Sequence, residues 1–339
     1  MILLNIVKED FMEQKKKELN WAILGTGVVA NEMAQALTNS GKRVYSVGNR
    51  TYSKAIDFAK KYNIKKVYDD FHEMFNDDNV DVIYITTPHN THIDFLESAL
   101  SSGKHVLCEK SITLNSSELE KAKKLAIKNN VILAEAMTIY HMPIYKKLRE
   151  MVSKGELGEV RMIQVNFGSY KEYDMNNRFF NMDLAGGALL DIGVYAITLA
   201  RCFMQSKPNK VVSQVQYAPS GADEKSGILM MNEEGEMAVI SLTLHSKQPK
   251  RAMISCDKGY IEIMEFPRGE EAVITYTATG EKQVISLGKQ SEALKYEMED
   301  MELAISGENN QMLLNYTTDV MDIMTQIRKE WGMVYKEEM

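Results

Sequence analysis

The sequence is short of cysteine, proline and positive charge, and each shortage excludes a class of protein. Its 339 residues include three cysteines, Cys108, Cys202 and Cys256, whose spacing fits no paired metal or redox motif. We therefore expect a reducing, cytoplasmic location. Only 6 prolines and 20 glycines argue against a collagen-like or low-complexity chain. The 40 Lys and Arg against 47 Asp and Glu give a net charge of -7, which argues against a nucleic-acid-binding protein.

Long hydrophobic runs are also absent. No stretch approaches the ~18 consecutive apolar residues of a membrane-spanning helix, so we expect no membrane partner. At the start of the chain a short apolar run ends at Lys8 and the basic cluster follows it, which is the reverse of a signal peptide. We therefore interpret residues 1–19 as an N-terminal extension.

What is present is the composition of an ordinary globular protein, with 45% hydrophobic and 26% charged residues. The length of 339 residues is about twice that of one ordinary domain. Residues 20–140 alternate apolar strands with helical periods, which predicts a parallel sheet covered by helices. Within them, Asn115 followed by Glu118 resembles the capping box that starts a helix.

The pattern changes in residues 141–339. Helical segments there are combined with alternating strands, and turn clusters stand at residues 232–235 and 267–269. These hairpin signals predict an α+β domain built on a large, mostly antiparallel sheet. The predicted fold class is therefore α/β, with a doubly wound parallel sheet first and an α+β domain second.

A glycine-rich turn follows the first predicted strand and opens the first predicted helix. It has the form G-x-G-x-x-A, the dinucleotide-binding fingerprint in the context that it requires. The glycines permit a tight turn and a close backbone approach to a pyrophosphate, and the helix start attracts the phosphate charge. The motif predicts a Rossmann domain that binds a nicotinamide dinucleotide through Gly25, Thr26, Gly27, Val28 and Val29. A tight strand-to-helix turn without a ligand is the alternative.

The end of the second strand bears on the choice of cofactor. NAD-selective sites usually carry Asp or Glu there, whereas this strand ends with Asn49 and Arg50. An arginine can bind the 2'-phosphate of NADP through charge-assisted hydrogen bonds. NADP(H) is therefore the expected cofactor, with NAD(H) as the second candidate. The alternative is that Arg50 is an ordinary solvated loop residue.

Polar segments follow two further strands. Ligands of open parallel sheets bind at the carboxyl ends of the strands, so both segments should face the same crevice as the glycine loop. The candidate cofactor-binding residues are Thr86, Thr87, Pro88, His89 and His92 after one strand, and Glu109 and Lys110 after the next. Alternatively, His89 and His92 cap or orient the following helix.

The segment G-G-A-L-L-D-I-G-V-Y at residues 186–195 is the most informative stretch of the second half. On a helix, Asp191 and Tyr195 are four residues apart and share a face. The fingerprint, T-T-P-H-N-T-H, C-E-K-S and this segment, in this order, resemble the glucose-fructose oxidoreductase, inositol dehydrogenase and MocA (Gfo/Idh/MocA) family. The resemblance covers nearly the whole chain and is strongest to the dihydrodiol dehydrogenase and xylose dehydrogenase branch.

The resemblance implies a Rossmann domain, an open-faced sheet domain that often pairs subunits, and a set of site residues. By this resemblance Lys110 contacts nicotinamide and substrate, Asp191 and Tyr195 are the acid and the proton donor, and Arg178 lies near the cofactor. The family usually has proline where this chain has Ser111, a change that should leave Lys110 less rigidly aimed. We expect a homodimer or higher homo-oligomer through the C-terminal sheet.

The residue chemistry supports the same assignment. Hydride transfer to or from a carbinol carbon must be matched by movement of the hydroxyl proton. We hypothesise that Tyr195 exchanges this proton, that the Lys110 ammonium lowers the tyrosine pKa, and that Asp191 orients substrate or lysine. Tyr195 can otherwise be a half-buried helix residue. No metal is expected, because only His89 and His92 are close in sequence and no H-E-x-x-H or C-x-x-C motif is present.

These inferences predict a cytoplasmic NADP(H)-dependent oxidoreductase that acts on a small-molecule sugar, polyol or cyclic diol. Two alternatives remain open. One is a family member that keeps its cofactor tightly bound and catalyses redox-assisted glycoside cleavage or internal oxidoreduction. The other is a non-catalytic NADP-sensing regulatory protein, against which the intact Lys110, Asp191 and Tyr195 argue.

Overall fold

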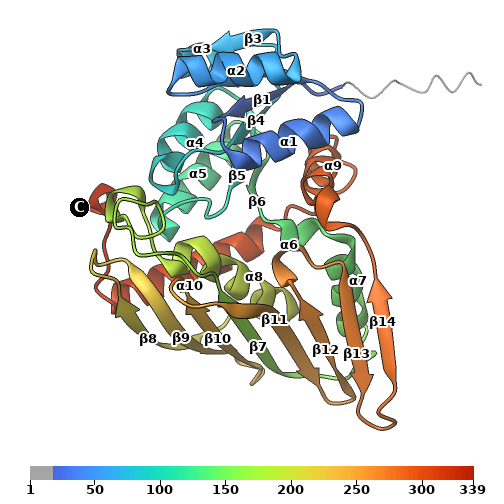
Figure 1. Ribbon diagram of the computed structural model, residues 1–339. Coiled ribbons are helices and arrows are strands. Elements are labelled where there is room, and N and C mark those ends of the chain that lie inside the picture. Colours follow the sequence, from blue (N-terminus) through green and yellow to red (C-terminus); the bar gives the residue numbers. More distant parts are fainter. Residues whose placement is uncertain (1–17) are drawn as a thin grey trace, which may run out of the picture.

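The computed structural model describes residues 18–339, and its first domain is built on a six-stranded parallel sheet (Figure 1). The predicted N-terminal extension falls, up to residue 17, outside the described residues. The strand order β3-β2-β1-β4-β5-β6 places the reversal of the winding between β1 and β4, where doubly wound sheets open a crevice at the strand ends. The strands are β1 Trp21–Leu24, β2 Val44–Gly48, β3 Lys66–Tyr68, β4 Val82–Ile85, β5 His105–Glu109 and β6 Leu133–Ala136.

Helices cover this sheet, as the alternating pattern predicted. Every residue of β1 and β4 is buried, which is why both strands are continuous apolar runs. Asn115 caps its helix by accepting the N–H of Glu118 at 3.0 Å, while the Glu118 carboxylate accepts the N–H of Leu114 at 2.9 Å. The helices are α1 Val28–Asn39, α2 Tyr52–Tyr62, α3 Phe71–Phe75, η1 His89–Thr91, α4 His92–Ser101 and α5 Ser116–Lys128.

The second domain is built on an eight-stranded sheet with the order β14-β13-β12-β11-β7-β10-β9-β8. Neighbouring strands are antiparallel except β7 and β10, which are parallel, so the predicted fold class is confirmed. The turn predicted at residues 232–235 joins β9 to β10. The strands are β7 Val160–Gly168, β8 Lys210–Tyr217, β9 Asp223–Met231, β10 Met237–Thr243, β11 Gln248–Cys256, β12 Gly259–Met264, β13 Glu271–Tyr276 and β14 Lys282–Ser286.

Helices pack on the face of this sheet that is turned toward the first domain (Figure 1). The segment Met182–Phe203 is long and apolar enough to cross a membrane, but 78% of its most apolar window is buried inside the fold. Its composition is therefore that of a core helix. The helices are α6 Thr138–His141, α7 Pro143–Ser153, α8 Val194–Phe203, α9 Ala293–Ile305 and α10 Leu314–Glu330.

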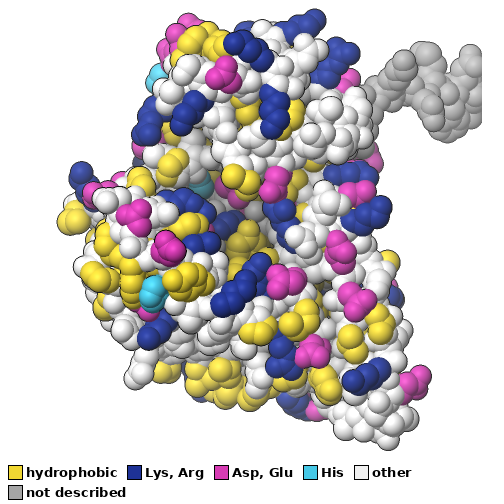
Figure 2. All heavy atoms as spheres, in the orientation of Figure 1, with side chains coloured by type: hydrophobic (Ala, Val, Ile, Leu, Met, Phe, Trp, Pro, Cys, Tyr) yellow, Lys and Arg dark blue, Asp and Glu magenta, His cyan; other side chains and the backbone are white. Residues whose placement is uncertain are grey.

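The opposite face of the large sheet carries exposed apolar side chains. Val212, Leu229 and Val239 are direct cross-strand partners on β8, β9 and β10, so their side chains form one row. All three are at least 40% exposed. Figure 2 shows hydrophobic side chains along the lower edge of the molecule, over this sheet.

Candidate active site

The glycine loop between β1 and α1 leaves the amino end of a helix open. Gly25 has a φ of +110°, and a Cβ there would lie 2.3 Å from Thr86 Oγ1, so the position requires glycine. An added Cβ on Gly27 would meet no atom within 4 Å. No side chain caps α1, and its first turn contains no acidic residue. The first backbone N–H groups of α1 are therefore available to an anionic phosphate.

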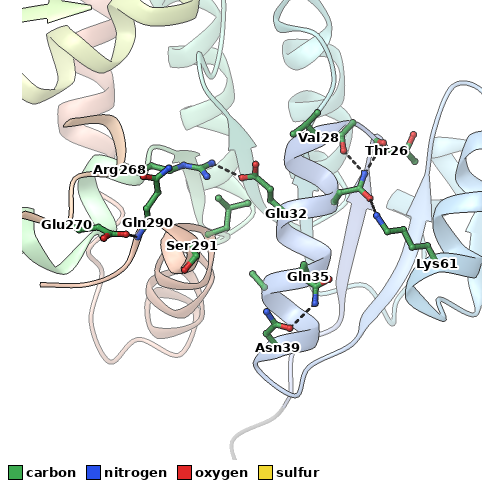
Figure 3. A pocket seen from close by; sticks show the side chains of 14 residues that line it. Thr26, Val28, Glu32, Gln35, Asn39, Lys61, Arg268, Glu270, Gln290 and Ser291 are labelled. Atoms are coloured by element: carbon green, nitrogen blue, oxygen red, sulfur yellow. Dashed lines mark hydrogen bonds and ion pairs between the residues drawn. The ribbon is translucent and has the colours of Figure 1, made fainter. Parts of the chain in front are cut away.

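These groups open into a cleft of about 1030 Å³ between the two domains (Figure 3). One wall is formed by Thr26 in the glycine loop and Val28 at the start of α1, and the other includes Arg268 on η4 (Phe266–Arg268). Arg268 reaches across to an ion pair of 2.8 Å with Glu32. The open helix start and the unobstructed Gly27 fit the pyrophosphate of a dinucleotide.

The end of β2 offers positive charge and no carboxylate. Arg50 is exposed, and the Asn49 side-chain amide donates to Thr51 O at 3.0 Å. The first turn of α2, which follows, has no acidic residue. A 2'-phosphate at this strand end would meet a guanidinium and no acid from β2 or from the first turn of α2.

His89 and His92 hold the backbone of the next loop. The His89 Nε2–H donates to Lys110 O at 3.0 Å, and the fully buried His92 ring lies 2.8 Å from Thr87 O and 3.0 Å from Ser111 O. Burial, together with the Lys110 charge, lowers the pKa of His89 to about 3, so the ring is neutral. Both histidines thus join the loop after β4 to the loop after β5.

The rest of this loop is ordered by its own hydrogen bonds. Thr86 donates its N–H and its hydroxyl to Leu24 O at 2.9 and 3.0 Å. Thr91 donates its hydroxyl to Thr87 Oγ1 at 2.9 Å, and the exposed Pro88 leads into η1. The loop after β4 is therefore fixed beside the glycine loop.

Lys110, Asp191 and Tyr195 meet where the two domains face each other. The Lys110 ammonium donates to Asp191 O at 2.7 Å and lies 3.3 Å from Asp191 Oδ1. It also stands 4.9 Å from the centroid of the Tyr195 ring. The side chains of Lys110 and Asp191 are only 14% and 13% exposed, so solvent screens their ion pair weakly. The structure thus brings together the three residues that the sequence singled out for chemistry.

The helix that carries Asp191 and Tyr195 is held by a residue that the sequence did not reveal. Asp191 lies in η3, the π-helical turn Leu189–Gly193 that leads into α8. The buried Asp223 carboxylate accepts the N–H of Leu189 at 2.7 Å, and a Cβ on Gly187 would lie 1.9 Å from Asp223 Oδ1. The paired glycines before the helix were the one sequence signal of this close approach.

Ser111 is anchored across the domain boundary. Its side chain is fully buried, and its hydroxyl donates to Leu190 O at 2.9 Å, one residue before Asp191. The sequence argument expected serine to aim Lys110 less rigidly than proline does. The structure instead shows a second hydrogen bond beside that of Lys110, to the carbonyl of the preceding residue, which a proline at this position cannot make.

Burial and charge set the protonation of the site. Burial alone would raise the pKa of Asp191, but Lys110 and Arg178 outweigh it and hold that pKa below its usual value. Burial would lower the pKa of Lys110, yet the charge of Asp191 holds that pKa above its usual value. Burial raises the pKa of Tyr195 to about 12, although Lys110 opposes the rise. The predicted lowering of the Tyr195 pKa is therefore wrong, because desolvation of the phenol exceeds the effect of the ammonium.

Glu109 and Arg178 lie on either side of this group. Tyr84 donates its hydroxyl to Glu109, whose second oxygen accepts the N–H of Lys110 at 3.3 Å. Arg178 comes from the loop between β7 and η3 and places its guanidinium 3.5 Å from Asp191 Oδ1. Glu109 is thus engaged inside the first domain, whereas Arg178 faces the reaction centre. In residues 18–339 no group of three His, Cys, Asp or Glu side chains could hold a metal ion.

Comparisons with known proteins match both domains to one family. Residues 19–137 match the "Oxidoreductase family, NAD-binding Rossmann fold" and residues 145–262 match the "GFO/IDH/MocA C-terminal domain". The trans-1,2-dihydrobenzene-1,2-diol dehydrogenase of Xenopus laevis is 33% identical over 258 residues, which cover 75% of this chain and 78% of the relative. This relative agrees with the dihydrodiol branch predicted from the motifs.

Solved structures share the fold at low sequence identity. KijD10, a 3-ketoreductase from Actinomadura kijaniata in complex with NADP and TDP-benzene, superposes with a TM-score of 0.82 at 19% identity, covering 92% of this chain and 98% of that chain. Levoglucosan dehydrogenase in complex with NADH and levoglucosan gives a TM-score of 0.84 at 16% identity, covering 93% and 98%.

Proposed function

Because this chain belongs to the GFO/IDH/MocA family of oxidoreductases, we propose that it transfers a hydride between NADP(H) and a hydroxyl or carbonyl carbon of a sugar, polyol or cyclic diol. The meeting of Lys110, Asp191 and Tyr195 beside the strand ends of the Rossmann sheet carries this proposal. The relatives support the substrate class, since they are named as a dihydrodiol dehydrogenase, a 3-ketoreductase and a levoglucosan dehydrogenase.

The residues have distinct roles in this proposal. A nicotinamide dinucleotide, when bound, supplies or accepts the hydride. Lys110 donates a hydrogen bond to the substrate oxygen, and Asp191 holds the ammonium in place. Tyr195 gives its phenolic proton to the carbonyl oxygen during reduction and takes a proton from the hydroxyl during oxidation. Gly25, Thr26, Gly27, Val28, Val29, Asn49, Arg50, Thr86, Thr87, Pro88, His89, His92, Glu109, Lys110 and Arg178 form the proposed cofactor side.

The division of the chain and its location follow from the same proposal. We assign residues 20–140 to cofactor binding and residues 141–339 to substrate binding and dimerisation. All three cysteines are free, and Cys108 and Cys202 are buried. Free thiols are typical of proteins in a reducing compartment, so we propose a cytoplasmic location.

An absorbance screen at the reduced-nicotinamide band tests the function. The purified protein is mixed with NADP+ or NAD+ and a panel of aldoses, polyols and diols, including trans-dihydrodiols. We expect substrate-dependent formation of NADPH with at least one member of the panel. Protein that carries cofactor at full occupancy without exchange would favour an internal oxidoreductase instead, and cofactor binding without turnover of any compound would favour a sensor.

Arg50 is expected to set the preference for NADPH. Arg50→Ala should weaken NADPH binding about tenfold, the cost of one charge-assisted contact, and change NADH binding less than about twofold. Fluorescence titration with both reduced cofactors measures the ratio. Lys65→Ala, at an exposed lysine of the same domain, is the matched control. If the wild type binds NADH at least as tightly as NADPH, Arg50 has no such role.

We propose that the apolar row of Val212, Leu229 and Val239 on the open sheet face is buried against a second copy of the chain. A specific interface needs roughly 800 Å² from each partner, which a broad sheet face can provide. The wild type should sediment as a dimer or larger at micromolar concentration, and Leu229→Lys combined with Val239→Lys should sediment as a monomer. Ile127→Lys, at an exposed apolar residue of α5, should leave the assembly intact. A wild type that sediments only as a monomer contradicts this interface.

A further inference from the structure

Two cations share one aromatic ring beside the reaction centre. Lys171 Nζ lies 4.4 Å and the Arg178 guanidinium carbon 4.2 Å from the centroid of the Phe179 ring. Both cations belong to the loop between β7 and η3, and Arg178 also reaches Asp191. We propose that Lys171 and Arg178 form an anion subsite, so that the substrate carries a phosphate or carboxylate group in addition to its reacting hydroxyl. This inference rests on the proposed function and narrows its substrate class.

The two cations are poorly neutralised by the protein. Among the described residues, Lys171 forms no ion pair, and its ammonium lies over the Phe179 ring. Arg178 has one carboxylate neighbour, Asp191 Oδ1 at 3.5 Å, and the same oxygen lies closer to Lys110, at 3.3 Å. Asp191 therefore serves both Lys110 and Arg178, and Lys171 has no carboxylate partner among the described residues, which leaves a local excess of positive charge. The whole chain has a net charge of -7, so this local excess is opposite to the overall charge.

Other acids of this region are directed elsewhere. Glu224 accepts a hydrogen bond from the Tyr173 hydroxyl. Asp174 accepts the N–H of Asn176 at 2.9 Å and so closes a turn. Glu172 is exposed and forms no ion pair with either cation. None of these carboxylates forms an ion pair with Lys171 or Arg178 within the part of the chain that the structure describes.

The backbone that carries Lys171 is held in place by contacts within the protein. Lys171 donates its backbone N–H to Leu244 O at 2.7 Å, and its carbonyl accepts from His245 Nδ1 at 2.9 Å. The His245 ring stacks on Tyr173 with centroids 3.8 Å apart and on Tyr170 at 5.5 Å. A site whose donors are ordered beforehand binds an anion at a lower entropic cost. Figure 2 shows Lys and Arg side chains around the hollow between the two domains.

The position of Lys171 and Arg178 favours contact with the substrate, a role that would replace the cofactor-side role proposed above for Arg178. The groups that fit cofactor phosphates, the start of α1 and Arg50, lie at the ends of β1 and β2 in the first domain. Lys171 and Arg178 lie in the second domain, and Arg178 is linked to Lys110 through their shared partner Asp191. An anion bound there would belong to the molecule that presents its hydroxyl to Lys110 and Tyr195.

Matched ligands test the subsite on the NADP+-loaded protein. Glucose, glucose 6-phosphate and glucuronate share one ring and differ in charge at one carbon, and inorganic phosphate tests the anion alone. Calorimetric titration should show at least one charged sugar binding about tenfold or more tightly than glucose, as expected for a charge-assisted contact. The comparison of glucose 6-phosphate with glucuronate distinguishes phosphate from carboxylate as the preferred anion.

Substitutions of Lys171 test whether its ammonium binds the anion. Lys171→Met should lose about tenfold in affinity for the charged sugar and change glucose and NADPH binding less than about twofold, and Lys171→Arg should restore the affinity. Lys258→Met, at an exposed lysine before β12, is the control. Glucose binding as tightly as both charged sugars, no binding of either charged sugar, or weakened NADPH binding in Lys171→Met would each overturn the subsite. If the protein turns over only neutral sugars or diols, the anion subsite is wrong and the proposed function stands. If it binds a charged sugar tightly but turns over no compound, the proposed function is wrong and the anion subsite stands.

Discussion

Replacing Tyr195 with phenylalanine is expected to lower kcat by at least ~100-fold in both directions, the lower end of typical acid–base contributions. The change removes the phenolic O–H and keeps the ring, which packs against Phe167 with centroids 6.2 Å apart. The fold and the affinity for NADP(H) should therefore stay unchanged. Steady-state kinetics on a substrate found by the screen, with a melting curve and a cofactor titration, measure all three quantities.

The pH dependence separates proton transfer from packing. Burial raises the pKa of Tyr195 to about 12, so the phenol keeps its proton at neutral pH. Reduction, which uses this proton, should vary little with pH, whereas oxidation, which requires the phenolate, should rise up to about tenfold per pH unit below that pKa. Tyr195→Phe should lose this slope. Tyr170→Phe, at an exposed tyrosine, should keep both the rate and the slope. Near-normal turnover in Tyr195→Phe would remove the phenol from the mechanism.

The features that sequence predicted best depend on local geometry. The φ of +110° at Gly25 and the cap at Asn115 are properties of a few consecutive residues, and both were readable from residue type and spacing. The large sheet was readable for a similar reason. Alternation along each strand, as in the exposed Leu229 between buried Ile228 and Met230, records which face is covered.

The features that sequence missed depend on contacts between distant segments. Asp223 lies against Gly187 although the two residues are 36 positions apart in the sequence. No motif or spacing in the sequence predicts this contact. The pKa of Tyr195 was also mispredicted because it depends on contacts between distant segments. An ammonium at the correct place could be inferred from a motif, but the degree of burial that outweighs it is a property of the packed fold.

Interactions between the domains were equally hidden. From the sequence, serine at position 111 was expected to aim Lys110 less rigidly than the proline usual in the family. In the structure the Ser111 hydroxyl donates a hydrogen bond to Leu190 O on the other domain. Arg268 bonds Glu32 across the cleft in the same way. The sequence therefore predicted which residues lie at the site, and the structure was needed to show the interdomain hydrogen bonds and ion pair that hold them there.

Lys110→Met is expected to lower kcat by a comparable factor of at least ~100. Methionine keeps much of the apolar stem but removes the Nζ that donates to Asp191 O at 2.7 Å. Asp191 would then retain Arg178 at 3.5 Å as its one cation among the described residues, so its pKa should rise. Activity of Lys110→Met should therefore depend on pH in the acid range where the wild type does not. Lys121→Met, at a surface lysine paired with Glu97, is the control.

The double variant Lys110→Met/Tyr195→Phe tests whether the two side chains serve one proton transfer. In the proposed mechanism the ammonium stabilises charge on the substrate oxygen and on the phenol, 4.9 Å away, so without the phenol it has less to stabilise. Residues that act as a unit are strongly non-additive. The double variant should therefore be within about tenfold of the slower single variant, whereas independent roles would multiply the two losses to about 10⁴-fold. A multiplied loss would assign Lys110 and Tyr195 to separate steps, and near-normal turnover of Lys110→Met would remove the ammonium from the chemistry.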